Sequence, residues 1–209
     1  MSVFETINFD HGVYAEIIHD EDCQDPRDAD DGVKIVILHR RYGNPSPDVG
    51  SSADEVLEWM KENKREWFFA NLYMYEHGSV ALRAGMSNPF HDPWDSGQVG
   101  IIALKKSEWG RGKGERNAKR LEWAKNVAQE YGQWMNGECY GYILRREDGE
   151  ELDSCWGFVG YEFVEEAARE AAEYHVKEEG ERKAREAEEA AQAEADAMEA
   201  ERPDMYQEA

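Results

Sequence analysis

The stretch that most constrains the fold is residues 88–104, NPFHDPWDSGQVGIIAL, in which a polar turn runs straight into an apolar segment. The first part carries two prolines together with Asp, Ser and Gly, which are the residues that turns favour. The second part, residues 99–104, has the composition of a strand. We expect the rest of the chain to be arranged around this turn and strand.

A second segment repeats the same combination, because residues 153–158 read DSCWGF and again place Asp, Ser, Trp and Gly beside a predicted strand. We expect the two motifs to approach each other. Two carboxylates and a histidine could bind a metal ion or carry out acid–base chemistry. The favoured alternative is a pair of hydrogen-bonded turns with the tryptophans packed beneath them. The residues concerned are His91, Asp92, Trp94, Asp95, Asp153 and Trp156.

No complete catalytic signature or fixed metal-binding spacing occurs in the sequence. We therefore assign no catalytic residue, no metal and no cofactor, and interpret the chain as a non-enzymatic protein.

Hydrophobic periodicity and turn residues predict a mixed order of strands and helices. Strands are expected at residues 3–9, 13–18, 33–38, 67–76, 80–83, 99–104, 139–146 and 151–158. Helices are expected at about 53–65, after a capping box that begins at Ser52, and at about 115–135 and 161–201. This order predicts an α+β fold with a mostly antiparallel sheet and two helices packed on one face of it. The nearly all-apolar strand 33–38 is expected to be central. We expect a globular domain over residues 1–160 and an acidic helical tail over 161–209.

The composition limits the possible partners, since the 209-residue chain has a formal charge of −22. The electrostatic field of such a negatively charged protein repels nucleic acid and attracts basic surfaces, although a high negative charge also increases solubility. Residues 1–10 lack the features of a secretory signal, and no apolar run approaches the length of a membrane span. Three irregularly spaced cysteines fit neither a disulfide framework nor a zinc site. These features favour a cytoplasmic protein with reduced thiols, and no membrane contact.

The acidity is concentrated in a loop at residues 19–32 and in the C-terminal helix. Carboxylates in a row along a helix could imitate the phosphates of a nucleic-acid backbone. The first turns of that helix carry Phe163 and several alanines that could dock on the sheet. The candidate partner-binding residues are Asp22, Asp25, Asp28, Asp30, Asp31, Glu165, Glu166, Glu170, Glu173, Glu178 and Glu179.

A basic segment between residues 105 and 125 contrasts with the acidic remainder. Its turn from Arg111 to Arg116 resembles the pyrophosphate-binding turn of the acetyltransferase superfamily, in which a strand, a glycine-containing turn and a helix N-terminus follow one another. Arg111 and Gly114 match that turn, whereas Arg116 stands where a small residue is expected. This resemblance implies acetyl-coenzyme A as a cofactor. A nucleic-acid patch is disfavoured by the overall charge, and a basic helix face that meets the protein's own acidic segments is favoured.

Three pieces of the chain carry a further resemblance: DPWDSGQVG at 92–100, YGQWMNGECYG at 131–141 and DSCWGF at 153–158. Together they resemble a group of bacteriophage and mobile-element proteins in which these motifs recur in this order. The resemblance covers about residues 85–165 and implies a small phage-encoded protein in the cytoplasm of an infected bacterium. It carries over no functional residues.

These observations together favour a phage accessory protein that binds a host protein with a basic groove. A nucleic-acid-binding defence factor, as in anti-CRISPR or anti-restriction inhibition, is the expected partner. The alternatives are an acetyltransferase-like enzyme and an assembly protein that forms a homo-oligomer through its C-terminal helix. The last alternative relies on an alanine stripe at residues 184, 187, 191 and 195, followed by Met198.

Overall fold

The chain forms two four-stranded antiparallel sheets and three helices, which confirms the predicted α+β class. A computed structural model describes residues 2–28, 30–43, 46, 48–109 and 116–200. The strands and helices divide between two compact units. Unit 1 comprises residues up to 19, 141–156 and from 162 onward, and unit 2 comprises residues 20–140 and 157–161. Each unit therefore combines segments that are far apart in the sequence.

The first sheet has the strand order β1-β2-β7-β8 and is built from two hairpins. One hairpin joins β1 (Val3–Asn8) to β2 (Tyr14–His19) through the short 3-10 turn Asp10–Gly12. The other joins β7 (Cys139–Arg145) to β8 (Glu151–Val159), with Gly149 at a positive φ of 89° in the turn. Both hairpins were predicted, because their turn residues are local signals.

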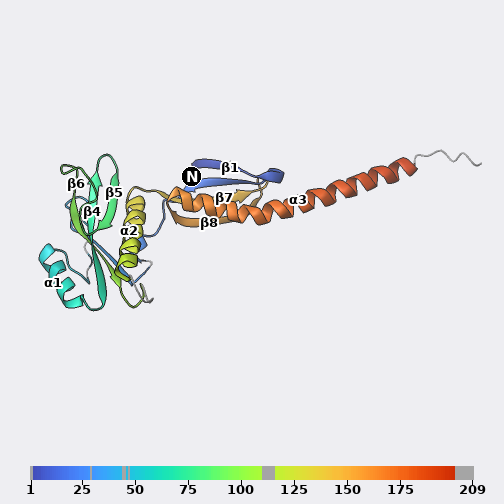
Figure 1. The fold of residues 1–209 in the computed structure, drawn as a ribbon. Coiled ribbons are helices and arrows are strands. Elements are labelled where there is room, and N and C mark those ends of the chain that lie inside the picture. The colour runs from blue at the N-terminus through green and yellow to red at the C-terminus, as the bar shows by residue number, and fades with distance from the viewer. Residues whose placement is uncertain (1, 29, 44–45, 47, 110–115, 201–209) are drawn as a thin grey trace, which may run out of the picture. The chain divides into compact units, whose positions relative to one another are not determined.

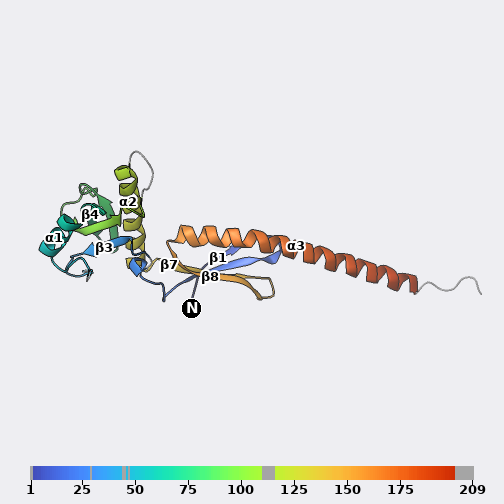
Figure 2. The ribbon, with the colours of Figure 1, turned by 90° about the horizontal axis from the view of Figure 1, so that it is seen from below.

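Helix α3 (Tyr161–Ala200) lies along one face of this first sheet (Figure 2). Val164, Ala168 and Ala172 are buried and recur every fourth residue, so they form one stripe of the helix. This docking was predicted, but the prediction that Phe163 takes part in it was wrong, because that side chain is 52% exposed. Small alanines allow the helix to approach the strands closely, whereas Phe163 lies off the buried stripe.

The second sheet, in unit 2, has the order β3-β6-β4-β5. Its strands are β3 (Val33–Ile37), β4 (Trp67–Glu76), β5 (Val80–Gly85) and β6 (Ser96–Lys105). Strand β6 pairs with both β3 and β4, so the strand of the opening motif is internal. The prediction that residues 33–38 form a central strand was wrong, because among the described strands β3 pairs with β6 alone and lies at the edge of the sheet.

Helices α1 (Ala53–Asn63) and α2 (Arg116–Met135) cover opposite faces of the second sheet (Figure 1). Alternate residues of β3 show this arrangement, since Ile35 belongs to the core under α2 and Val36 to the core under α1. The expectation of two helices on one face was therefore wrong. Coverage of both faces also explains why an edge strand is nearly all apolar.

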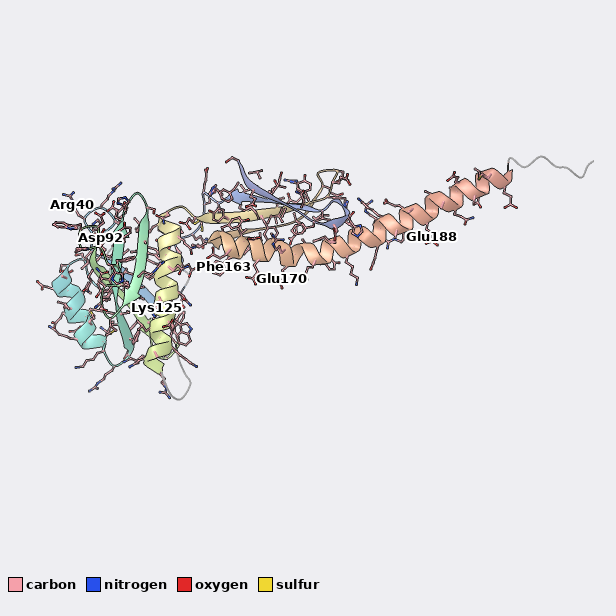
Figure 3. All side chains as sticks on the ribbon, turned by 45° about the horizontal axis from the view of Figure 1, so that its top comes forward. Arg40, Asp92, Lys125, Phe163, Glu170 and Glu188 are labelled. Atoms are coloured by element: carbon pink, nitrogen blue, oxygen red, sulfur yellow. The ribbon has the colours of Figure 1, made fainter. Side chains whose placement is uncertain are left out.

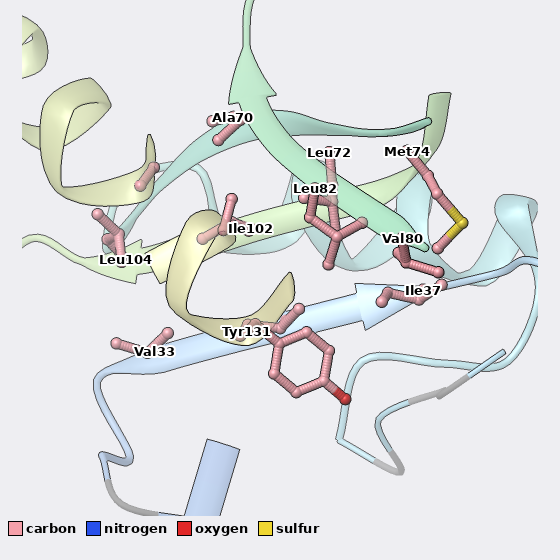
Figure 4. Packing of buried hydrophobic residues seen from close by; sticks show 14 residues of the cluster. Val33, Ile37, Ala70, Leu72, Met74, Val80, Leu82, Ile102, Leu104 and Tyr131 are labelled. Carbon is pink, nitrogen blue, oxygen red and sulfur yellow. The ribbon is translucent and has the colours of Figure 1, made fainter. Parts of the chain in front are cut away.

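The larger core lies between α2 and the sheet, where Leu72, Leu82, Ile102 and Leu104 are fully buried beside Tyr131 (Figure 4). Helix α1 begins at the predicted capping box, because the Glu55 N–H donates to Ser52 Oγ at 3.3 Å and the Ser52 N–H donates to Glu55 Oε2 at 3.2 Å. The bounds of α1 and α2 lie within a few residues of the ranges predicted from the sequence.

Candidate partner-binding surface

The most extended acidic surface of the described chain is helix α3. This 40-residue helix carries fourteen acidic and five basic side chains. Every side chain from residue 184 to residue 199 is exposed, so this part of the helix does not pack against the described residues of its own unit. Side chains project from the docked and exposed parts alike, as Glu170 and Glu188 illustrate (Figure 3). The helix therefore offers carboxylates to solvent along most of its length.

The predicted glutamates on the docked part of α3 differ in how freely they can meet a partner. Glu166, Glu170 and Glu173 are exposed and form no ion pair within the described part of the chain. Glu165 accepts hydrogen bonds from Arg169 at 2.7 and 3.1 Å, and Glu178 accepts one from the Tyr174 hydroxyl at 2.7 Å. These last two are held within the helix but remain near the surface, so they stay part of the candidate surface.

The prediction that Glu179 binds a partner was wrong, because its side chain is 3% exposed and cannot reach one. Its carboxylate accepts from Arg182 at 2.6 Å and from Arg146 at 2.8 Å. The bonds from Arg182, together with those from Arg146, lower the pKa of Glu179 even though burial opposes the shift. The sequence could not show this, since Arg146 follows β7 and is brought to the helix only by the fold.

The acidic loop also contributes fewer free carboxylates than the sequence suggested. Asp25 is half-buried and binds Arg27 through both carboxylate oxygens, and Arg27 in turn lies 5.6 Å from the centre of the Tyr131 ring. Burial raises the pKa of Asp25, but the Arg27 bonds outweigh it and the net shift is downward. Asp30 accepts from the Gly32 N–H at 2.7 Å. Both residues therefore shape the loop.

Three other aspartates of this loop, Asp22, Asp28 and Asp31, are exposed. They belong to unit 2, whereas α3 belongs to unit 1 from Glu162 onward. The acidic loop and the acidic helix thus belong to different units.

The turn in the opening motif is held by its own side chains. Asp92 accepts from the N–H groups of Trp94 and Asp95 at 2.8 and 3.1 Å. The bond from Asp95 and then that from Trp94 lower the pKa of Asp92. Asp95 lies 3.3 Å from His77 Nδ1, and His91 is exposed. This geometry agrees with the hydrogen-bonded turn that the sequence favoured. Trp94, however, is 92% exposed and does not pack beneath the turn.

The second motif lies on β8 of the first sheet, whereas the opening motif leads into β6 of the second. Asp153 accepts from the Tyr142 hydroxyl at 3.0 Å, and burial together with this bond raises the pKa of Tyr142. Trp156 lies against Gly141 of β7, where a Cβ would come within 2.2 Å of the Trp156 ring. The residue pattern was detected in the sequence, but this cross-strand contact requires the pairing of the strands.

Substituting Gly141 with alanine is expected to displace Trp156 and to lower the stability of unit 1 by about 1–2 kcal/mol, because the added methyl occupies the place of the ring. Trp156 is the one tryptophan among residues 141–156, so its fluorescence in a variant with the other six tryptophans replaced by phenylalanine reports this displacement.

The comparison for stability is Trp94→Ala in the chain that keeps its other tryptophans, which removes an exposed ring and should change stability by less than about 0.5 kcal/mol. If Gly141→Ala leaves both the Trp156 emission and the unfolding midpoint unchanged, the cross-strand packing is refuted.

A cavity that the sequence did not indicate lies between α1 and the second sheet. It has a volume of about 470 Å³ and an apolar wall that includes Val56, Leu57 and Met60. His39 also lines the cavity, and its Nδ1 is buried with no hydrogen-bond partner in the described part of the chain. A cavity of this kind accepts an apolar group, but its lining contains none of the predicted site residues.

The acetyltransferase-like turn lies only partly within the residues that the structure describes. Residues 111–115 of the acetyltransferase-like turn lie outside the described residues, and Arg116 is the first residue of α2.

In the described part of the chain, no group of three or more His, Cys, Asp or Glu side chains is placed to hold a metal ion. The three helices in that part are all too short or too polar to cross a membrane.

Comparisons of the chain with protein-family models, with curated proteins and with solved structures found no match.

Proposed function

We propose that this chain is a phage-encoded accessory protein that binds and inhibits a host protein with a basic groove, a nucleic-acid-binding defence factor of the kind targeted by anti-CRISPR or anti-restriction proteins. The observation that supports the proposal is the exposed acidic face of α3. Thirteen of its fourteen acidic side chains, all except the buried Glu179, lie at the surface over a length of about 60 Å, or roughly one per 5 Å. One strand of DNA carries a charge about every 3.4 Å, so the gross spacing is similar.

The five basic residues of α3 reduce its net charge, so the resemblance to a nucleic-acid strand is one of spacing more than of full charge density. Three of the five cations lie between residues 177 and 183, near the docked part of the helix. The exposed part from residue 184 to residue 199 contains six acidic residues and one arginine. This exposed part is therefore the segment proposed to enter the groove.

The first test is capture of the host partner on the immobilised full chain, followed by washes at low and high salt. Screening shortens the Debye length from about 30 Å at 0.01 M to about 3 Å at 1 M salt, so an electrostatic complex should dissociate at high salt. A captured nucleic-acid-binding protein must also be displaced by its own DNA or RNA substrate. Capture that resists both salt and substrate contradicts groove occupancy.

Neutralising three exposed glutamates, Glu188→Gln, Glu189→Gln and Glu194→Gln, is expected to weaken partner binding about tenfold at low salt, since exposed charge pairs each contribute about 0.2–1 kcal/mol. The change is measured as Kd by biolayer interferometry at several salt concentrations. The salt dependence of Kd should become less steep.

The matched control neutralises Glu62, Glu122 and Glu130, which are exposed on α1 and α2 of unit 2. It removes the same charge from the chain but leaves α3 intact, so Kd should change less than threefold. If lysine substitutions at residues 188, 189 and 194 leave inhibition intact, the mimicry proposal fails. A doubling of mass in light scattering that is lost when residues 184–209 are deleted would instead favour the assembly alternative.

A further inference from the structure

Unit 2 contains a pocket whose charge is opposite to that of the whole protein. It has a volume of about 610 Å³ and lies where the segment after α1, the end of β6 and the start of α2 meet. Five of its lining residues are cations and one is a carboxylate: Arg65, Lys105, Lys106, Arg116, Arg120 and Glu66. The full chain has a formal charge of −22, so this concentration of cations is a local reversal.

Arg120 is the residue that makes this pocket more than a patch of surface cations. It is 6% exposed and lies one turn into α2. Its guanidinium donates to the Trp109 carbonyl at 2.9 Å, to Asn117 Oδ1 at 3.2 Å and to the Lys106 carbonyl at 3.4 Å. These acceptors are neutral, and no carboxylate pairs with Arg120 within the described residues. They orient the guanidinium but do not offset its charge, and a buried charge is costly unless it is paired.

Lys106 is held in place in a similar way. Its ammonium donates to the carbonyls of Lys64 and Arg65 at 2.7 and 3.4 Å, where α1 has just ended. These partners are again neutral. Lys105 differs, because it forms an ion pair with Glu108 at 2.9 Å. Arg120 and Lys106 therefore bring two positive charges to the pocket that form no ion pair with a carboxylate within the described residues.

The start of α2 adds to the positive potential of the pocket. The first turn of a helix exposes N–H groups and the positive end of the helix dipole, and acidic side chains usually stabilise it. The first turn of α2 contains no acidic residue and begins with Arg116. An anion in the pocket would thus meet cationic side chains and a helix N-terminus together, which is a combination that suits phosphate.

We propose that this pocket binds a phosphate group, either as a free inorganic anion or as the phosphate end of a nucleotide. Its volume lies within the range of about 300–1,000 Å³ that is common for small-molecule sites. The site is independent of the acidic face of α3 and of any host partner, so the two proposals can fail separately.

The test is isothermal titration calorimetry of the full chain with inorganic phosphate, inorganic pyrophosphate and ADP at low salt. Saturable binding of at least one of them is expected. The variant Arg65→Gln with Arg116→Gln should weaken that binding at least tenfold. A control variant of equal charge, Lys61→Gln with Lys125→Gln, changes exposed cations of α1 and α2 outside the pocket and should alter Kd less than twofold.

The outcomes separate the two sources of phosphate. Tighter binding of ADP than of pyrophosphate identifies a nucleotide site, and equal or weaker binding of ADP identifies a site for the inorganic anion. Arg120→Lys retains the charge but loses the fork of donors, so it should weaken binding while circular dichroism confirms that the variant is folded. The proposal is overturned if no ligand gives saturable heat at millimolar concentration, or if the control variant loses as much affinity as the pocket variant.

Discussion

Replacing Gly100 with alanine is expected to destabilise unit 2 by about 3 kcal/mol, which is at the upper end of the cost of overpacking. Gly100 lies on the internal strand β6, opposite Ile37 of β3 and Leu72 of β4. A Cβ at this position would lie 1.8 Å from the Val36 carbonyl oxygen and 3.2 Å from the Ile37 Cα. Backbone atoms cannot rotate away as a side chain can, so β3 would have to separate from β6.

The measurement is chemical denaturation combined with hydrogen exchange of the β3 and β6 amides, which resolves the free energy of opening for each strand. Gly97→Ala is the matched control, because Gly97 lies on the same strand and a Cβ there meets nothing within 4 Å. It should change stability by no more than about 1 kcal/mol. Equal stabilities of the two variants would contradict the close approach of β3 and β6.

Replacing Glu179 with glutamine is expected to destabilise unit 1 by about 2 kcal/mol at neutral pH. The substitution keeps the shape of the side chain but removes the buried carboxylate that Arg146 and Arg182 share, and leaves them only their exposed partners Glu150 and Glu186. Removing one partner of a buried ion pair lowers the free energy of unfolding more when the site is fully shielded from water than when it is partly exposed. Here the two arginine side chains are 21% and 35% exposed, so water can recover part of that cost.

The loss of stability caused by Glu179→Gln is expected to become smaller as the pH falls. The pKa of Glu179 is lower in the folded chain than its ordinary value of 4.5. The carboxylate therefore stabilises the fold fully above about pH 4.5, and this contribution is lost as the pH falls through the folded pKa. The difference between parent and variant should be constant from pH 6 to 7 and should shrink below pH 4.5.

Denaturant titrations at each pH, with hydrogen exchange to localise the loss to unit 1, provide the measurement. Glu178→Gln is the control, because Glu178 is an exposed neighbour that accepts from Tyr174 within the same helix. It should cost less than about 0.5 kcal/mol. A cost for Glu179→Gln that is the same at pH 4 and pH 7 would show that the carboxylate charge is not what stabilises the site.

Most of the helices and strands could be predicted because their signals are local. Ser52 and Glu55 lie three residues apart and form the capping box without help from the rest of the chain. Gly149 and Gly137 occur at positive φ where the sequence placed a turn and a helix end. The alternating apolar pattern likewise located the strands, but it could not distribute them between two sheets.

The candidate surface was only partly predictable, because the burial of a charged side chain depends on contacts between segments that are distant in the sequence. The acidic character of α3 is visible in its residues, and its exposed part needs no partner within the chain. Glu179 and Asp25 look like their acidic neighbours in the sequence, yet each is held by arginine and contributes to the fold. Trp94 looks like a packed residue and is exposed. The positive charge of residues 105–125 is visible in the sequence. The sequence does not show that Arg65, forty residues before Lys105, lines the same pocket.

The α+β class, the order of the strands and helices, the turns and the long acidic helix follow from local sequence patterns, because they depend on residues within a few positions of one another. Three features follow only from the folded chain: β3 is an edge strand, α1 and α2 lie on opposite faces, and certain charges are buried. Those outcomes depend on contacts between distant segments, where the packing of both partners sets the burial of each. A single local pattern, such as an apolar strand or a row of carboxylates, is compatible with several such contacts.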